Sequence, residues 1–142
     1  MSDMLTQETV DLGSGTPGEP RPDLDGELVS IPGNAAVWLI TDGGYRKLVP
    51  NNATLGNLFV PNATIIQDIN ASNIPEEAAI TDGAVLAQST AGTVYLITNG
   101  QKWPITAGGF SRYQFASARV VTVPQVLLDS IPDGYVIRWP QP

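Results

Sequence analysis

The residues that most suggest a site are aromatic side chains next to basic ones. They form three groups: Tyr45-Arg46-Lys47, Lys102-Trp103 and Arg112-Tyr113. An aromatic ring beside a charged donor is the combination that a sugar-stacking site or a protein-binding hot spot uses. The alternative is that the basic side chains cover apolar edges with their long stems. These seven residues are therefore candidate binding residues, with surface packing as the competing interpretation.

Catalytic chemistry finds little support in the sequence. The chain has no His and no Cys, so Ser-His-Asp and Cys-His arrangements and imidazole or thiolate zinc sites are impossible. Residues 13–18 fit the pattern G-x-G-x-x-G. They lie in a proline-rich segment without the strand and helix that a dinucleotide-binding loop needs.

Carboxylate pairs are the remaining catalytic option, since two acids can hydrolyse a glycosidic bond. The candidates are Asp42, Asp68, Glu76, Glu77, Asp82, Asp129 and Asp133. Most of them stand at turn signals, where Asp serves the backbone. No calcium loop of the D-x-[DN]-x-[DN]-G type occurs. We expect no enzyme activity, no cofactor and no metal site.

The negative charge is concentrated at the N-terminal end. Of the formal net charge of −7, residues 1–27 carry seven acids against Arg21, and the remainder carries seven acids against six bases. Nucleic-acid binding normally needs a basic stripe, which is missing, so this class of partner is not expected. The chain lacks a long apolar run and a Sec-type leader pattern, so we expect neither membrane insertion nor a classical signal peptide.

A duplication is the strongest signal along the chain. Displacing the sequence by 57 residues superimposes Val37–Gly43 on Val94–Gly100, and Ile74-Pro75 on Ile131-Pro132. A one-residue gap falls in the middle and is compensated later. Such self-similarity predicts a repeated structural unit. We expect an extended acidic arm over 1–24, repeats over 25–81 and 82–138, and a tail over 139–142.

Each repeat is expected to be mainly β with short helices. Strands are predicted at 28–31, 37–40 and 63–66, and at 85–88, 94–97 and 120–123, because these runs are rich in β-branched and aromatic residues. Asp42-Gly43 and Asn99-Gly100 predict hairpin turns, and Pro104 predicts an edge strand. Residues 51–60 and 107–115 are expected to form a short helix or turn, and 124–130 one helical turn. A unit of 57 residues buries little apolar surface, so the copies are expected to share a core with pseudo-twofold symmetry.

The second repeat resembles a known bacterial pattern. Val94–Ile105, Val121–Pro124 and Leu128–Gly134 are similar to repeats of cell-wall-associated proteins and to the periplasmic repeats of the EccB component of actinobacterial type VII secretion. Those repeats are in turn similar in fold to the cell-wall-binding subunit of a phage lysin. The first repeat has Glu76-Glu77 where the second has Asp133-Gly134. The resemblance implies a non-enzymatic protein of a cell envelope or virion.

Two functions remain open from the sequence. The first is a structural module of a bacterial or phage surface assembly that self-associates through its N-terminal arm, as a homo-oligomer or beside other subunits. The second is a recognition domain for a glycan or cell-wall polymer, using the seven aromatic and basic residues. In both cases we expect a particle or cell-surface location.

Overall fold

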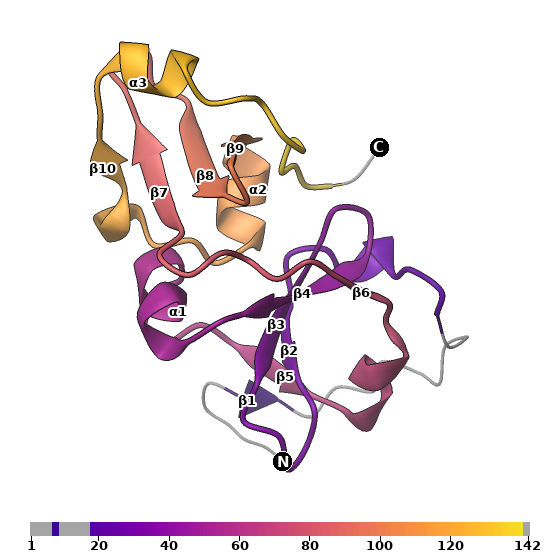
Figure 1. Ribbon diagram of the computed structural model, residues 1–142. Coiled ribbons are helices and arrows are strands. Elements are labelled where there is room, and N and C mark those ends of the chain that lie inside the picture. The colour runs from indigo at the N-terminus through magenta and orange to yellow at the C-terminus, as the bar shows by residue number, and fades with distance from the viewer. Residues whose placement is uncertain (1–6, 9–17, 141–142) are drawn as a thin grey trace. The chain divides into compact units, whose positions relative to one another are not determined.

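Strands outnumber helices in the computed structural model, which describes residues 7–8 and 18–140. The expectation of a mainly β protein is confirmed: the strands form one six-stranded and one four-stranded sheet (Figure 1). The chain divides into two compact units. Unit 1 comprises residues 1–49 and 62–79, and unit 2 comprises residues 50–61 and 80–142.

Unit 1 contains the six-stranded sheet, in the order β1-β5-β2-β3-β4-β6. Its strands are β1 (Gln7–Glu8), β2 (Leu28–Ser30), β3 (Val37–Thr41), β4 (Tyr45–Val49), β5 (Ile65–Gln67) and β6 (Glu76–Glu77). Two 3-10 helices, η1 (Pro22–Leu24) and η2 (Ile69–Asn73), complete the unit. The β2-β3-β4 meander is antiparallel, whereas β5 is parallel to β2 and β6 is parallel to β4. Trp38 and Ile40 belong to a buried apolar cluster, and both sequence segments of the unit contribute side chains to it.

Unit 2 contains the four-stranded sheet, in the order β10-β7-β8-β9. Its strands are β7 (Val85–Gln88), β8 (Val94–Thr98), β9 (Gln101–Ile105) and β10 (Val121–Thr122). Its helices are α1 (Asn52–Leu58), α2 (Ala107–Arg112), η3 (Ser117–Arg119) and α3 (Gln125–Asp129). Pro104 lies in the terminal strand β9, as predicted, and its missing N–H breaks no ladder between neighbouring strands.

Both predicted hairpin turns form. Asp42 and Asn99 take the left-handed conformation, with φ of 60° and 55°, and Gly43 and Gly100 follow with φ of 87° and 74°. Successive residues with positive φ give a turn whose twist matches that of the flanking strands. Asp and Asn tolerate this conformation better than most residues, which explains why these dipeptides predicted the turns.

The short helices begin where a side chain can cap them. The Asn51 side chain accepts a hydrogen bond from the Thr54 N–H at the start of α1, and Thr106 does the same for Gly109 at the start of α2. These caps satisfy backbone donors that would otherwise have no partner in the first turn. In α3, Pro124 stands at the N-cap position. The helical turn predicted at 124–130 is therefore present as α3, which begins directly after Pro124.

The compact units differ from the predicted repeat boundaries at residues 50–61. This segment belongs to the first repeat by sequence, but it packs within unit 2. Leu58 and Phe59 are buried there, and the Phe59 ring stacks on Phe115 with centroids 5.5 Å apart. The segment that carries α1 is therefore donated to the unit formed by the second half of the chain.

A local twofold relation joins this segment to its counterpart in the second repeat. Phe59 and Phe115 form an antiparallel bridge. The Val60 N–H donates to the Gln114 carbonyl at 2.9 Å, and the Ala116 N–H donates to the Leu58 carbonyl at 2.9 Å. The two bonds exchange places under a shift of 56 residues, which is what a duplicated segment pairing with its own copy produces. The duplication itself stays a prediction.

Candidate functional sites

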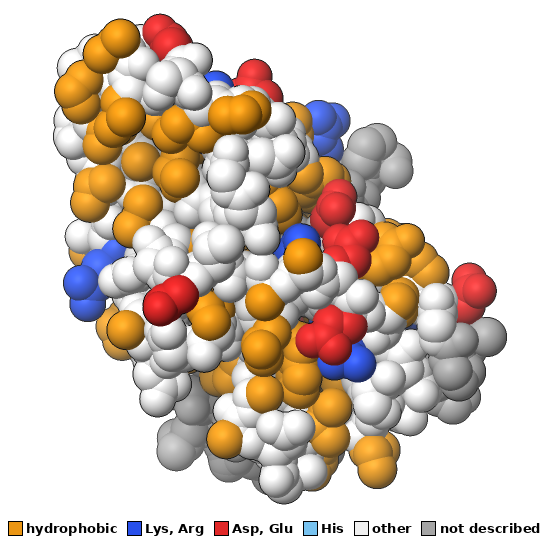
Figure 2. Space-filling model, viewed as in Figure 1, with side chains coloured by type: hydrophobic (Ala, Val, Ile, Leu, Met, Phe, Trp, Pro, Cys, Tyr) orange, Lys and Arg blue, Asp and Glu red, His pale blue; other side chains and the backbone are white. Residues whose placement is uncertain are grey.

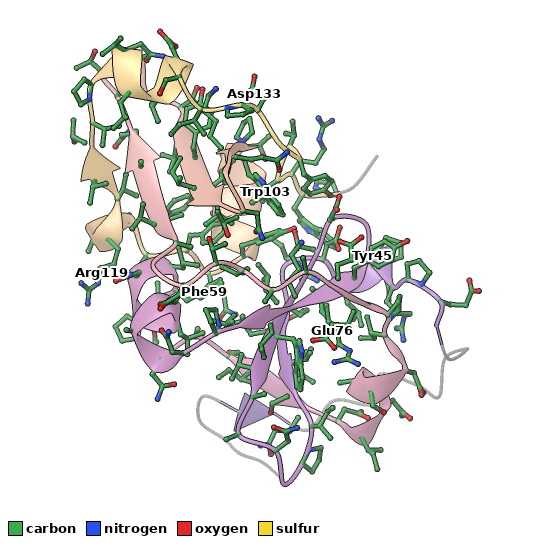
Figure 3. The ribbon with its side chains drawn as sticks, in the orientation of Figure 1. Tyr45, Phe59, Glu76, Trp103, Arg119 and Asp133 are labelled. Carbon is green, nitrogen blue, oxygen red and sulfur yellow. The ribbon has the colours of Figure 1, made fainter. Side chains whose placement is uncertain are left out.

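Arg46, one of the predicted binding residues, clamps strand β4 to the segment that follows η2. Its Nε donates to the Ile74 carbonyl at 2.7 Å, and its guanidinium lies 3.4 Å from the Glu76 carboxylate. The guanidinium also stands over the Trp38 ring, 5.0 Å from its centroid. Trp38 Nε1 donates to the same Glu76 at 2.9 Å, and Figure 3 labels Glu76. We call these residues the Arg46 clamp, in which every charged group has a partner within unit 1.

Lys47 extends this attachment by one residue. It is 6% exposed, and its Nζ donates to the Ala78 carbonyl at 3.1 Å and lies 3.8 Å from Glu77 Oε1. Burial and the nearby Asp42 carboxylate raise the pKa of Glu77, against the opposing effect of Lys47. Asp42 and Glu77 are thus a carboxyl pair that the fold brings together from the candidates noted in the sequence. The Glu77 carboxylate of this pair lies beside Lys47, whose ammonium already donates to the Ala78 carbonyl.

Lys102 forms the corresponding clamp in unit 2. Its Nζ donates to the Ile131 carbonyl at 2.7 Å and pairs with Asp133 Oδ1 at 2.9 Å. The ammonium lies 5.7 Å from the centroid of the Tyr95 ring. We call this set the Lys102 clamp.

The two clamps correspond residue by residue. A shift of 57 carries Trp38 to Tyr95, Ile74 to Ile131 and Glu76 to Asp133, and a shift of 56 carries Arg46 to Lys102. The backbone agrees, since the Arg46 N–H donates to Pro75 and the Lys102 N–H donates to Pro132. The residue types of the cation and the carboxylate differ between the clamps. In both units, however, a basic side chain bonds to a backbone carbonyl and lies beside a carboxylate. Arg46 therefore holds the segment at Ile74 and Glu76 against β4, and Lys102 holds the segment at Ile131 and Asp133 against β9.

Trp103 and Tyr113 lie inside unit 2. Trp103 is 4% exposed, its indole N–H donates to Gln101 Oε1 at 3.2 Å, and its ring meets Tyr135 edge-on. Tyr113 is fully buried and stacks on Phe115, with centroids 5.4 Å apart. A buried ring offers no open face to a sugar, so this burial argues against the stacking role expected for both residues. Sequence alone could not separate them from exposed rings, because each adjoins a basic residue.

The two remaining predicted residues are less enclosed. The Arg112 guanidinium lies 4.0 Å from the centroid of the Trp139 ring, and Arg112 is partly buried. Tyr45 is partly exposed in β4, opposite Thr41 in the hairpin. Tyr45, Arg46 and Lys47 belong to unit 1, whereas Lys102, Trp103, Arg112 and Tyr113 belong to unit 2. The seven residues are therefore divided between two separate structural units.

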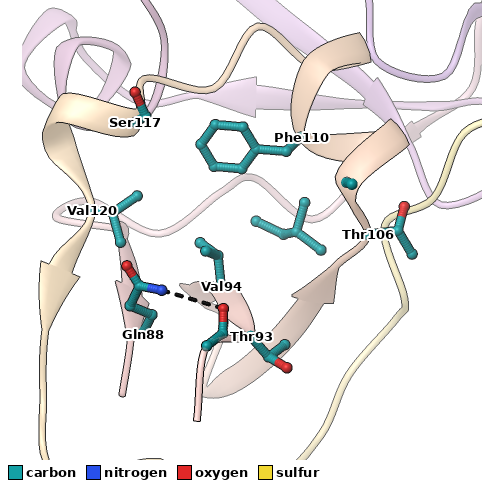
Figure 4. A pocket seen from close by; sticks show the side chains of 10 residues that line it. Gln88, Thr93, Val94, Thr106, Phe110, Ser117 and Val120 are labelled. Atoms are coloured by element: carbon teal, nitrogen blue, oxygen red, sulfur yellow. Dashed lines mark hydrogen bonds between the residues drawn. The ribbon is translucent and has the colours of Figure 1, made fainter. Parts of the chain in front are cut away.

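Sequence reasoning missed a pocket in unit 2. It has a volume of about 480 Å³ and lies between the β7-β8 hairpin, α2 and the end of η3 (Figure 4). Apolar side chains such as Val94, Phe110 and Val120 line it. Gln88, whose Nε2 donates to the Gly92 carbonyl at 3.2 Å, is among its polar residues. Its lining comes from β7, β8, β9, α2 and η3 and the loops beside them, so no local sequence pattern marked it.

The open edge of the unit 2 sheet is a second feature that the sequence did not reveal. Val121 in the terminal strand β10 is 45% exposed, and Val126 and Leu127 in the following helix are 75% and 49% exposed. Apolar side chains gather on the surface around α3 and β10 (Figure 2). Contiguous exposed apolar residues of this kind favour an interaction surface.

Within residues 7–8 and 18–140, no group of three or more His, Cys, Asp or Glu could hold a metal ion. Over the same ranges, every helix falls short of the length and apolar character needed to cross a bilayer.

Comparison with known protein families, with curated proteins and with solved structures returned no match. The bacterial repeat named from the sequence therefore stays a resemblance.

Proposed function

We propose that this chain is a non-enzymatic structural module of a bacterial or phage surface assembly, and that it self-associates through its N-terminal arm. The surface setting comes from the sequence resemblance. One structural observation supports self-association: β1, which belongs to the arm, pairs with β5 in the sheet of unit 1.

The arm contributes a strand to a sheet. Gln7 and Glu8 pair in parallel with Ile65 and Ile66 of β5, at the end of the six-stranded sheet. The arm is acidic and rich in Pro and Gly, so it cannot bury enough apolar surface to fold by itself. Strand pairing supplies backbone hydrogen bonds without such burial, and strand addition to a sheet edge is a common way for one chain to bind another.

The arrangement of the polar residues supports a structural role over a catalytic one. Arg46, Lys47 and Lys102 each bond to a backbone carbonyl and lie beside a carboxylate. An active site instead brings its reactive groups together in a cavity. The pocket of unit 2 is mainly apolar and contains no Asp, Glu, Lys or Arg.

Truncating the arm tests the proposal. Residues 18–24 should be kept, because the Gly18 and Arg21 N–H groups donate to Asn73 and Gly44, and Leu24 packs against the core of unit 1. We therefore compare the full chain with a variant lacking residues 1–16, by size-exclusion chromatography with light scattering over a range of concentrations. The full chain should exceed its monomer mass of 15.1 kDa, and the truncated chain should not. A single cooperative thermal unfolding transition is the control that the truncated chain is folded.

The proposal fails if the full chain stays monomeric at every concentration, or if the truncation leaves the native mass unchanged.

Glycan recognition is the second candidate, and the observation in its favour is the partial exposure of Tyr45 beside Arg46. Binding to purified cell walls should then be lost in Tyr45→Ala while thermal stability is retained. Equal binding by Tyr45→Ala and the unmodified chain would exclude this surface.

A further inference from the structure

The sheets of the two units have corresponding edges. In unit 1, β5 lies parallel to β2, the first strand of the meander. In unit 2, β10 lies parallel to β7, which is the first strand of the corresponding meander. Each edge strand is followed by a short helix, η2 in unit 1 and α3 in unit 2. The outer side of β10 in unit 2 therefore corresponds to the outer side of β5 in unit 1, and both can accept a further parallel strand.

The two edges differ in whether that position is filled. The outer side of β5 is paired with β1 of the arm. β10 is the last strand of its sheet, and over residues 7–8 and 18–140 no strand pairs with its outer side. Both of its residues are exposed. An uncovered edge with an exposed apolar side chain is a template for pairing with another chain.

We propose that β10 accepts the β1 segment of a second copy of this chain as a parallel strand. This inference rests on the proposed self-association and adds the surface that receives the arm. The pairing of β1 with β5 is its template, since the same two residues already add to a parallel strand in the corresponding place. Each chain has one arm and two acceptor edges. Moving the arm from its own β5 to a neighbour's β10 therefore exchanges one set of backbone hydrogen bonds for a similar set.

Charge favours this acceptor. The arm is acidic, whereas residues 113–128, which include β10, contain Arg119 and no acid. Arg119 lies two residues before β10, is exposed and extends away from the ribbon (Figure 3). Because Gln67 and Thr122 each directly precede the residue whose N–H donates back to the first meander strand, we align Ile66 with Val121. Glu8 would then lie opposite Val121, two residues beyond Arg119, the last residue of η3.

The direction of pairing also suits the exposed apolar residues. A parallel strand added to β10 runs toward α3, where Val126 and Leu127 are exposed. The interface is heterologous, since the arm of one copy meets the β10 edge of another. Such contacts repeat head to tail and give rings or filaments.

The absence of Cys from the chain permits a direct test by disulfide cross-linking. We mix the single variants Glu8→Cys and Val121→Cys in equal amounts, with a mass tag on the first, and oxidise them. A tagged heterodimer can form only between two molecules. Neighbouring strands are about 4.8 Å apart, which falls within the Cα separations that a disulfide bridges.

Three further variants complete the design. Glu8→Cys with Ile66→Cys in one chain reports the pairing of the arm with its own β5. Ser111→Cys, exposed on α2, replaces Val121→Cys as the matched control for random collisions. Arg119→Glu is tested in the otherwise unmodified chain, where Glu8 is present, and should weaken self-association measured by light scattering roughly threefold to tenfold. Arg138→Glu, also exposed, should leave self-association unchanged.

A heterodimer that forms with Val121→Cys and not with Ser111→Cys supports the inference. Equal yields with both, or no heterodimer while the full chain still assembles through its arm, overturn the inference and leave the proposed function standing. A full chain that is monomeric and forms no heterodimer overturns both.

Discussion

Replacing Lys102 by Met tests what the clamp contributes to stability. Met keeps most of the apolar stem of this side chain, which is 8% exposed, and removes the ammonium. The variant loses the hydrogen bond to the Ile131 carbonyl and the pairing with Asp133. Asp133 is 70% exposed, so water solvates its carboxylate once the partner has gone. The Ile131 carbonyl is part-buried and loses an acceptor bond that water replaces poorly.

The magnitudes of these two losses differ. Leaving a buried polar group without its partner costs about 1–3 kcal/mol, whereas an exposed ion pair is worth less than about 1 kcal/mol. Lys102→Met should therefore lower the free energy of unfolding by about 1–3 kcal/mol. Asp133→Asn should lower it by less than about 1 kcal/mol. Urea unfolding followed by circular dichroism measures both values under the same conditions.

The relative size of the two effects decides whether the reasoning holds. If Asp133→Asn costs as much as Lys102→Met, the ion pair and not the carbonyl bond holds the segment. If Lys102→Met costs nothing, the clamp has no role in stability. Arg46→Met and Glu76→Gln form the matched pair in unit 1, where Arg46 should again be the more costly position.

Three further predictions concern packing, backbone and pH. Trp103→Ala should lower the free energy of unfolding by about 3–5 kcal/mol, because the ring is buried and its removal leaves a cavity; a loss of binding without this destabilisation would contradict the structural role. Gly44→Ala should destabilise more than Gly33→Ala, because both glycines have positive φ but of the two only Gly44 would place a Cβ against the Arg21 backbone. An equal fall in the thermal unfolding midpoint of the two variants would rule out that steric contact. The raised pKa of Glu77 means that the folded chain binds this proton more tightly than the unfolded chain does. Stability from Glu77 is therefore full below its ordinary pKa of 4.5 and falls as the pH rises through the raised value. The free energy of unfolding of the unmodified chain minus that of Glu77→Gln should accordingly decrease from pH 4 to pH 7, and an increase would refute the sign.

Several elements could be predicted from the sequence because local chemistry decides them. Asp42-Gly43 and Asn99-Gly100 are hairpin turns, since their residues accept positive φ at low cost. The β-branched and aromatic runs at Val37–Thr41 and Val94–Thr98 are strands. Residues 52–58 and 107–112 are short helices within the segments where a helix or turn was expected. Glu76 stands where the second predicted repeat has Asp133, and both acids lie beside the basic residue of their strand.

The candidate site depended on tertiary structure to a much greater degree. Trp103 and Tyr113 adjoin basic residues in sequence, as an exposed binding residue would. Tyr135 nevertheless packs against the Trp103 ring, and Tyr113 stacks on Phe115, which in turn stacks on the distant Phe59. Conversely, Val126 and Leu127 are apolar and remain exposed, because α3 is short and only Leu128 turns into the core.

The sequence by itself determined the two hairpin turns, the β-branched and aromatic strands beside them and the acidic character of the arm, because each depends on residues within a few positions of one another. Only the tertiary structure decided which unit receives the segment of α1, which aromatic rings are buried, and which sheet edge the arm occupies. Those outcomes depend on competition among surfaces far apart in the sequence. The local chemistry of Phe59 does not specify Phe115 as its partner, and nothing within Gln7-Glu8 specifies β5 as the strand it joins.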